Sequence, residues 1–189
     1  MERLGVNVGV TKLKTIFILA LCISLIVGCS APEKQTIVVH KNKFFKCEPS
    51  GIIGKKMVTL INNARSLKRK CGLKTFTPAG PLKWNSTLVK ASLNHSRDMA
   101  KHDFLSHTGS KGSSSDERVK KVGYAWKSVG ENISAGSETC EEVVAGWLNS
   151  PGHCKNIMNS NFTEVGAACF RNPSSKYGTY WTLVLASPL

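Results

Sequence analysis

Four side chains in the second half of the chain are of the types that build metal or acid–base sites: His107, Glu131, Glu142 and His153. Imidazole nitrogens bind divalent cations, and carboxylates either orient imidazoles or act as general bases. Each residue also has a plain structural explanation on its own. Glu142, for example, lies three residues after Thr139, at the spacing of a helix capping box. The prediction of a site therefore depends on the fold bringing all four side chains together.

Helices are predicted for most of the chain that must position these residues. Apolar residues spaced by three and four predict a first helix over 55–70, with Gly72 as its stop, and a loop over 75–83. Asn85 or Ser86 can cap a second helix that ends near Asp103, and His95 lies on its apolar stripe, where we expect it to pack. Capping boxes or a proline in the first turn predict three shorter helices, over 114–122, 139–148 and 151–158.

The end of the chain changes to a β pattern. Residues 164–170 and 177–186 are rich in β-forming side chains around a polar turn, which predicts an antiparallel hairpin. Residues 130–135 fit either a strand or an extended loop. Because helices come first and strands cluster late, the predicted class is α+β.

The first residues predict export. A basic start is followed by the apolar run 16–28 and then by Cys29, and Ile-Val-Gly-Cys resembles a bacterial lipobox. We expect a lipoprotein signal peptide over 1–28, a lipidated Cys29, and a polar tether over 29–52 with a short strand at 36–40. Ser30 favours sorting to the outer membrane, facing the periplasm or the exterior. The alternatives are a secretory signal cut near Ala31 and an uncleaved single-pass anchor.

The charge of the chain limits its partners. The formal net charge is +14, and removal of residues 1–28, with three basic residues and one acidic, leaves +12. Such a charge suits anionic lipid headgroups or acidic cell-wall polymers. Nucleic acid is excluded as a partner, because an exported protein rarely meets it and the sequence has no signature of a nucleic-acid-binding module. The sequence does not determine the oligomeric state.

Cysteine usage predicts two disulfides in an oxidising compartment. One of the seven cysteines leaves with the signal and Cys29 would carry lipid. The remaining five are Cys47, Cys71, Cys140, Cys154 and Cys169. We expect Cys154 to pair with Cys169, across the segment between the last helix and a strand, and Cys47 with Cys71, around the first helix. Cys140 would be left over, although sequence alone leaves other pairings open.

Several short motifs recur in this order in one family. They include Gly130-Glu131-Asn132-Ile133, a glutamate five residues before Trp147, and Ser-Pro-Gly-His-Cys-Lys-Asn-Ile-Met over 150–158. Further matches are Pro-Leu-Lys-Trp-Asn over 81–85 and Phe-Leu-Ser-His over 104–107. With these motifs, the chain resembles the bacterial secreted branch of the CAP superfamily, also called SCP-like extracellular proteins. The resemblance covers 58–185 and assigns 53–189 to one CAP domain.

The resemblance implies a three-layer α-β-α sandwich with a small antiparallel sheet. It also implies that His107, Glu131, Glu142 and His153 form a tetrad in a surface cleft. In this family the two histidines bind a divalent metal such as zinc, and the two acids would orient the imidazoles. The chain departs from many bacterial relatives after His107, where Thr-Gly-Ser-Lys-Gly replaces a Pro-Asp-Gly segment, and at Cys154, where many relatives have arginine.

Two functions fit this site. The first is an exported, lipid-anchored protein that binds a lipid, a cell-wall component or another envelope ligand. The alternative is a metal-dependent hydrolase, a peptidase or cell-wall hydrolase, with metal-bound water and Glu131 or Glu142 as the general base. Binding is favoured because the sequence has neither a Gly-x-Ser-x-Gly elbow nor a His-Glu-x-x-His motif. A third role for the tetrad is to stabilise the fold as a buried polar network.

Overall fold

We describe a computed structural model of the chain over residues 45–47 and 50–189. The chain divides into two units, Met1–Val38 and Val39–Leu189, and all described residues belong to the second. The predicted signal peptide, the lipidated Cys29, the strand at 36–40 and most of the tether lie outside the described residues. Among the residues that are described, no helix is long and apolar enough to span a bilayer.

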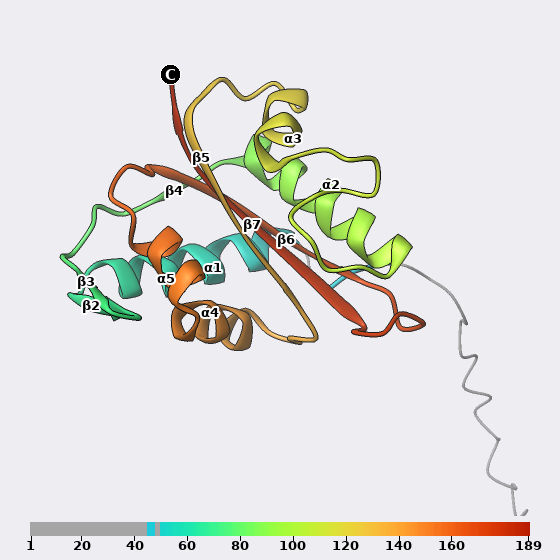
Figure 1. The fold of residues 1–189 in the computed structure, drawn as a ribbon, viewed down its shortest axis with the longest axis horizontal. Coiled ribbons are helices and arrows are strands. Elements are labelled where there is room, and N and C mark those ends of the chain that lie inside the picture. Colours follow the sequence, from blue (N-terminus) through green and yellow to red (C-terminus); the bar gives the residue numbers. More distant parts are fainter. Residues whose placement is uncertain (1–44, 48–49) are drawn as a thin grey trace, which may run out of the picture. The chain divides into compact units, whose positions relative to one another are not determined.

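A small sheet forms the middle layer (Figure 1). Its long strands are β5 (Trp126–Ala135), β6 (Glu164–Arg171) and β7 (Thr179–Pro188), and β7 pairs antiparallel with both of the others. Two short strands join β6: β1 (Phe45–Lys46) antiparallel and β4 (Lys83–Trp84) parallel. Almost every residue of β7 is buried, as expected for a strand covered on both faces. The predicted late hairpin is confirmed, and residues 130–135 belong to a strand.

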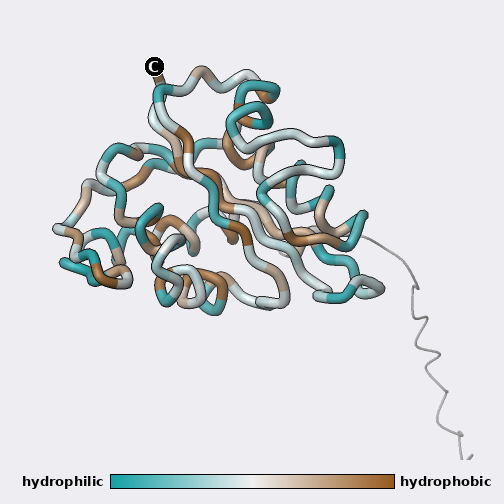
Figure 2. Tube along the Cα trace, in the orientation of Figure 1, coloured by the Kyte–Doolittle hydropathy of each residue, from teal (hydrophilic) through white to brown (hydrophobic). Residues whose placement is uncertain are grey.

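Helices cover both faces of this sheet. One layer contains α1 (Ser50–Arg65), α4 (Cys140–Asn149) and α5 (Pro151–Met158), whose apolar side chains form one core with Val165, Ala167 and Leu183. The other contains α2 (Ser86–His102) and α3 (Ser115–Lys121), where Leu88 and Val119 pack with Val184. Figure 2 shows hydrophobic colour concentrated on the segments that face the sheet. The predicted α+β class and α-β-α sandwich are confirmed.

The second layer lies unusually close to the sheet at one point. A Cβ atom on Gly166 of β6 would lie 2.4 Å from the backbone nitrogen of Val89 in α2, so only glycine fits there. The hydroxyls of Ser92 and Ser96 donate to the carbonyls of Gly166 and Ala168 at 2.9 and 3.0 Å. These short polar side chains let α2 approach the strand while satisfying buried groups.

Local capping signals placed most helix starts correctly. Asn85 caps α2 by accepting from the N–H groups of Thr87 and Leu88, and a reciprocal capping box opens α3 at Ser114. The first helix differs from the prediction, because it begins at Ser50 and ends at Arg65. The residues after it form a hairpin, β2 (Arg69–Cys71) and β3 (Lys74–Phe76), and Gly72 sits in its turn at φ +62° instead of ending the helix.

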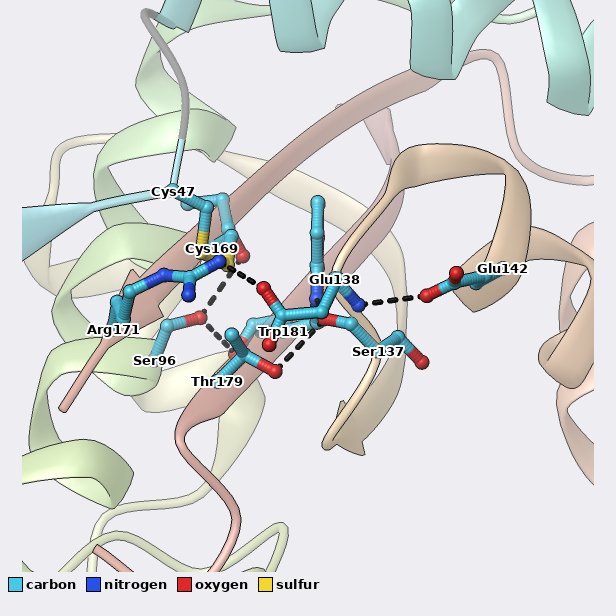
Figure 3. Close-up of a disulfide and its surroundings, with 11 residues drawn as sticks. Cys47, Ser96, Ser137, Glu138, Glu142, Cys169, Arg171, Thr179 and Trp181 are labelled. Atoms are coloured by element: carbon cyan, nitrogen blue, oxygen red, sulfur yellow. Dashed lines mark hydrogen bonds and ion pairs between the residues drawn. A yellow bond between two sulfur atoms is a disulfide. The ribbon is translucent and has the colours of Figure 1, made fainter. Parts of the chain in front are cut away.

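The disulfide pairing predicted from sequence is wrong, although the four cysteines are right. Cys47 is bonded to Cys169, and Cys71 to Cys154. Pairing of β1 with β6 brings Cys47 beside Cys169, and Figure 3 shows this bond next to Trp181. The β2–β3 hairpin packs against α5, which brings Cys71 to Cys154. The cysteines that lie nearest to each other along the chain are therefore not the ones that are bonded. Cys140 is buried and takes part in neither disulfide, as expected.

A buried guanidinium holds the first helix layer together. Arg65, at the end of α1, is 1% exposed and donates from Nε to the carbonyl of Gly80 at 2.8 Å. Its Nη1 donates to the carbonyls of Ile157 and Asn159 at 2.7 and 2.8 Å, and Nη2 to that of Phe162 at 3.2 Å. The C-terminal carbonyls of α5 lack partners within the helix, so one cation satisfies them and joins three chain segments.

We predict that Arg65→Lys lowers the free energy of unfolding by about 2–4 kcal/mol, because an ammonium cannot reach four carbonyls in a planar fork. Urea denaturation followed by circular dichroism measures the change. The exposed Arg97→Lys is the matched control and should change stability by less than about 0.5 kcal/mol. Equal effects of the two substitutions would contradict the role given to Arg65.

Candidate functional site

A buried carboxylate lies at the centre of the site. Glu131, in the middle of β5, is 6% exposed. Its Oε1 accepts from Nδ1 of His107 at 2.8 Å, and its Oε2 accepts from Nη2 of Arg118 at 2.7 Å. Burial alone would raise the pKa of Glu131, but the hydrogen bond from His107 and the charge of Arg118 outweigh it and lower this pKa below its ordinary value. Glu131 is therefore ionised and fully engaged.

His107 is the exposed end of this cluster. It lies in the loop between α2 and α3, and 57% of its side chain is exposed. Because Nδ1–H donates to the carboxylate, Nε2 is the ring nitrogen left for a ligand. The sequence prediction that an acid orients this imidazole fits the geometry for Glu131.

Arg118 is a functional residue that sequence reasoning missed. It is buried in α3, and besides Glu131 it donates to the carbonyls of His107 at 2.9 Å and Ser113 at 2.6 Å. The capping box at Ser114 predicted the helix but not which of its basic residues turns inward. The available signal was physical: a carboxylate buried in a strand requires a cation.

The loop that carries His107 is held in place by a histidine of α2. His95 is 1% exposed, its Nε2 donates to the carbonyl of Ser106 at 2.9 Å, and its ring meets Phe104 edge-on. Burial lowers the pKa of His95, the nearby charge of Arg118 lowers it further, and Glu131 only partly opposes them, so the ring is neutral. Packing of His95 in the core was predicted correctly, and its anchoring of the loop was not.

Two asparagines fix the backbone of α5 at His153 to the same strand. Asn132 donates to the carbonyl of His153 at 3.1 Å. Asn156 donates to the carbonyl of Glu131 at 3.1 Å and to Oδ1 of Asn132 at 2.9 Å. The first turns of α5 are thereby fixed to β5. Burial lowers the pKa of the half-buried His153, and electrostatic repulsion from His107 lowers it further.

Glu142 is positioned differently from the other three predicted residues. It is exposed at the start of α4, where its carboxylate accepts from the N–H of Glu138 at 2.8 Å (Figure 3) and its own N–H donates to Thr139 Oγ1 at 3.2 Å. Within the described part of the chain its carboxylate has no hydrogen bond or ion pair with either histidine. Unpaired N–H groups at a helix start attract an acid, so capping accounts for this residue.

The donor set determines what a cation would find here. Over residues 45–47 and 50–189, no cluster of three or more His, Cys, Asp and Glu side chains could hold a metal ion. At most two imidazoles, those of His107 and His153, would be available to a cation here, with Glu131 orienting the first ring. A separate open pocket of about 620 Å³ lies near the start of β5 and contains none of the four predicted residues.

The described residues thus form a mainly antiparallel sheet covered by helices on both faces, with a histidine–glutamate–arginine cluster on its edge strand β5. The profile of the cysteine-rich secretory protein family (CAP) matches residues 58–185, so the chain belongs to this family. It is 38% identical over 152 residues to the uncharacterized protein YkwD of Bacillus subtilis, covering 79% of this chain and 54% of YkwD. The chain thus spans about half the length of that relative.

Two solved structures have the same fold. An extracellular protein containing an SCP domain from Bacillus anthracis superposes with a TM-score of 0.60 at 24% identity, covering 72% of this chain and 41% of that chain. An outer surface protein from Borrelia burgdorferi gives a TM-score of 0.60 at 16% identity, covering 78% of this chain and 100% of that chain. The family predicted from the sequence motifs is confirmed.

We predict that His107→Ala raises the pKa of His153 toward its ordinary value, because the mutation removes an imidazole whose repulsion opposes protonation of His153. An NMR titration of the imidazole signals measures this shift, with His153 assigned from the His153→Gln spectrum. His102→Ala, which removes a histidine that bonds to Asp98 instead, should leave the His153 pKa unchanged. If His107→Ala has no effect either, the two rings do not share a site.

Proposed function

We propose that this chain is an exported, lipid-anchored envelope protein whose His107–Glu131–His153 site binds a ligand and does not catalyse hydrolysis. The observation that carries the proposal is the state of Glu131. Its two oxygens are occupied by His107 and Arg118, and its pKa is lowered. A general base needs a pKa near the working pH and access to a proton. Glu131 has neither, and instead holds an imidazole in a fixed orientation.

A divalent cation fits this function as part of the ligand site. His107 Nε2 and a ring nitrogen of His153 would hold it, and the bound cation would act as a Lewis acid toward an anionic or carbonyl oxygen of the ligand. The protein's own contribution is to keep the His107 ring oriented through Glu131 and Arg118. With two imidazoles as ligands, we expect modest affinity that falls as the pH drops, because protonated histidine cannot bind metal.

Export and anchoring are inferred from the N-terminal sequence. The Ile-Val-Gly-Cys motif supports lipidation at Cys29 after removal of 1–28, and Ser30 favours the outer membrane. Two proteins of the same fold support an envelope location, since one is described as extracellular and the other as an outer surface protein.

The binding and hydrolase hypotheses differ in whether the protein cleaves a substrate. We predict that zinc binding, measured by calorimetry on the purified chain, weakens about 10–100-fold in both His107→Ala and His153→Ala. His102→Ala, which removes an exposed histidine outside the site, is the matched control. Casein and peptidoglycan fragments should be cleaved only at the background rate by all four proteins. Zinc-dependent cleavage that is lost in both site variants would establish the hydrolase instead.

Lipidation is tested separately. In a bacterial host fed radiolabelled palmitate, the full chain should incorporate label and fractionate with the outer membrane, and Cys29→Ala should do neither. Cys22→Ala is the matched control, because this cysteine lies within the predicted signal and its loss should leave labelling intact. Label that persists in Cys29→Ala would contradict the anchor.

A further inference from the structure

The β2–β3 hairpin exposes apolar side chains at an unusual place. Its two-residue turn is Gly72–Leu73, and the positive φ at Gly72 alone is the pattern of a type II′ turn. The side chain at the second turn position, Leu73, is 100% exposed, and Leu67, just before β2, is 62% exposed. Figure 2 shows hydrophobic colour in this otherwise hydrophilic hairpin. A leucine presented at the tip of a hairpin is placed for contact with another surface.

The hairpin and the residue before it are strongly cationic. Residues 68–74 contain four Lys and Arg residues and no Asp or Glu. Three of these cations, Lys68, Lys70 and Lys74, are exposed. Within the described residues none of the three forms an ion pair, although Lys74 lies 5.0 Å from the ring of Phe76. Their charge is therefore available to an external anion.

The hairpin is held rigidly on the body of the domain. Cys71, the last residue of β2, is bonded to Cys154 in α5. The turn itself rests on the first residue of that helix, since a Cβ on Gly72 would lie 3.0 Å from Cβ of Pro151. The apolar turn is thus fixed in its outward position, and its exposure is a built feature of the fold.

We propose that the β2–β3 hairpin docks the domain on an anionic lipid bilayer. Leu73 at the tip enters the interfacial region, and Lys68, Lys70 and Lys74 contact lipid phosphates. The three exposed lysines require an anionic partner. The fully exposed leucine favours a lipid surface, because a soluble polyanion has no apolar region in which to bury it. This surface is independent of the imidazole site and of lipidation. Docking places the start of α5, two residues before His153, beside the membrane.

The test uses residues 39–189, a compact unit that contains the described core and both disulfides. The match to the solved Borrelia structure covers the whole of that chain, which supports testing this unit by itself. Co-sedimentation is measured with vesicles of phosphatidylcholine, with and without phosphatidylglycerol, and soluble polyphosphate is the competing polyanion. An intact Cys71–Cys154 bond, checked by mass spectrometry, establishes that each variant is folded around the hairpin.

We expect binding only when phosphatidylglycerol is present. Leu73→Ser should weaken it about tenfold, and Lys68→Glu combined with Lys70→Glu at least about twentyfold. The matched controls are Leu105→Ser, at another exposed leucine, and Lys120→Glu combined with Lys121→Glu, which makes the same change in charge. His107→Ala and His153→Ala should bind vesicles normally.

Three outcomes would overturn the proposal. The first is no binding to phosphatidylglycerol vesicles. The second is equal loss in the hairpin variants and their controls, which would indicate a general effect of charge. The third is a Leu73→Ser protein that binds vesicles as tightly as the unmodified chain while polyphosphate competes fully, which would identify a polyanion as the partner.

Discussion

The site depends on one buried negative charge. A carboxylate in the middle of a covered strand is costly unless donors surround it, and the chain supplies these from two directions. Arg118 comes from α3 and His107 from the preceding loop, and both meet at Glu131. Satisfying the charge therefore fixes the position of α3, the course of the loop and the tautomer of the exposed ring in a single step.

On the other face of the sheet, Arg65 is a buried positive charge that is likewise surrounded by hydrogen-bond partners. It has no carboxylate partner among its hydrogen bonds and instead satisfies four carbonyls, including those at the end of α5. Because α5 also carries His153, the guanidinium sets the far end of the helix while Asn132 sets the near end. The two helical layers thus each depend on one buried ion, and the imidazoles are positioned from both layers.

Features coded by neighbouring residues could be predicted from the sequence. Asn85, Ser114 and Pro151 act within one helical turn, so their spacing alone was enough. The late hairpin and the sandwich followed from β periodicity and from the family motifs. His107, Glu131 and His153 were likewise singled out by their motifs, and the structure bonds His107 to Glu131 and anchors the backbone of His153 to the same strand. Glu142, singled out with them, lies at a helix start and accepts from the N–H of Glu138.

What could not be predicted depends on contacts between distant segments. Arg118 is one of many cations, and only the fold shows that it turns toward Glu131. The disulfides were predicted from the closeness of the cysteines along the chain. The actual pairing is decided by the order of the strands in the sheet and by the packing of the hairpin against α5. The end of α1 was predicted too late, because the basic residues that follow Arg65 are also typical of the last turn of a helix. In the structure Arg65 points inward to distant carbonyls, and residues 69–76 pair as β2 and β3.

The Cys71–Cys154 bond has a consequence for how the domain responds to its surroundings. It joins the β2–β3 hairpin covalently to the helix that bears His153, so the hairpin and that helix keep one relative position. Reduction of the bond would leave the hairpin held on α5 by packing alone, through Gly72 against Pro151 and Phe76 against the buried end of the helix. The outward position of the turn therefore depends on an oxidising surrounding.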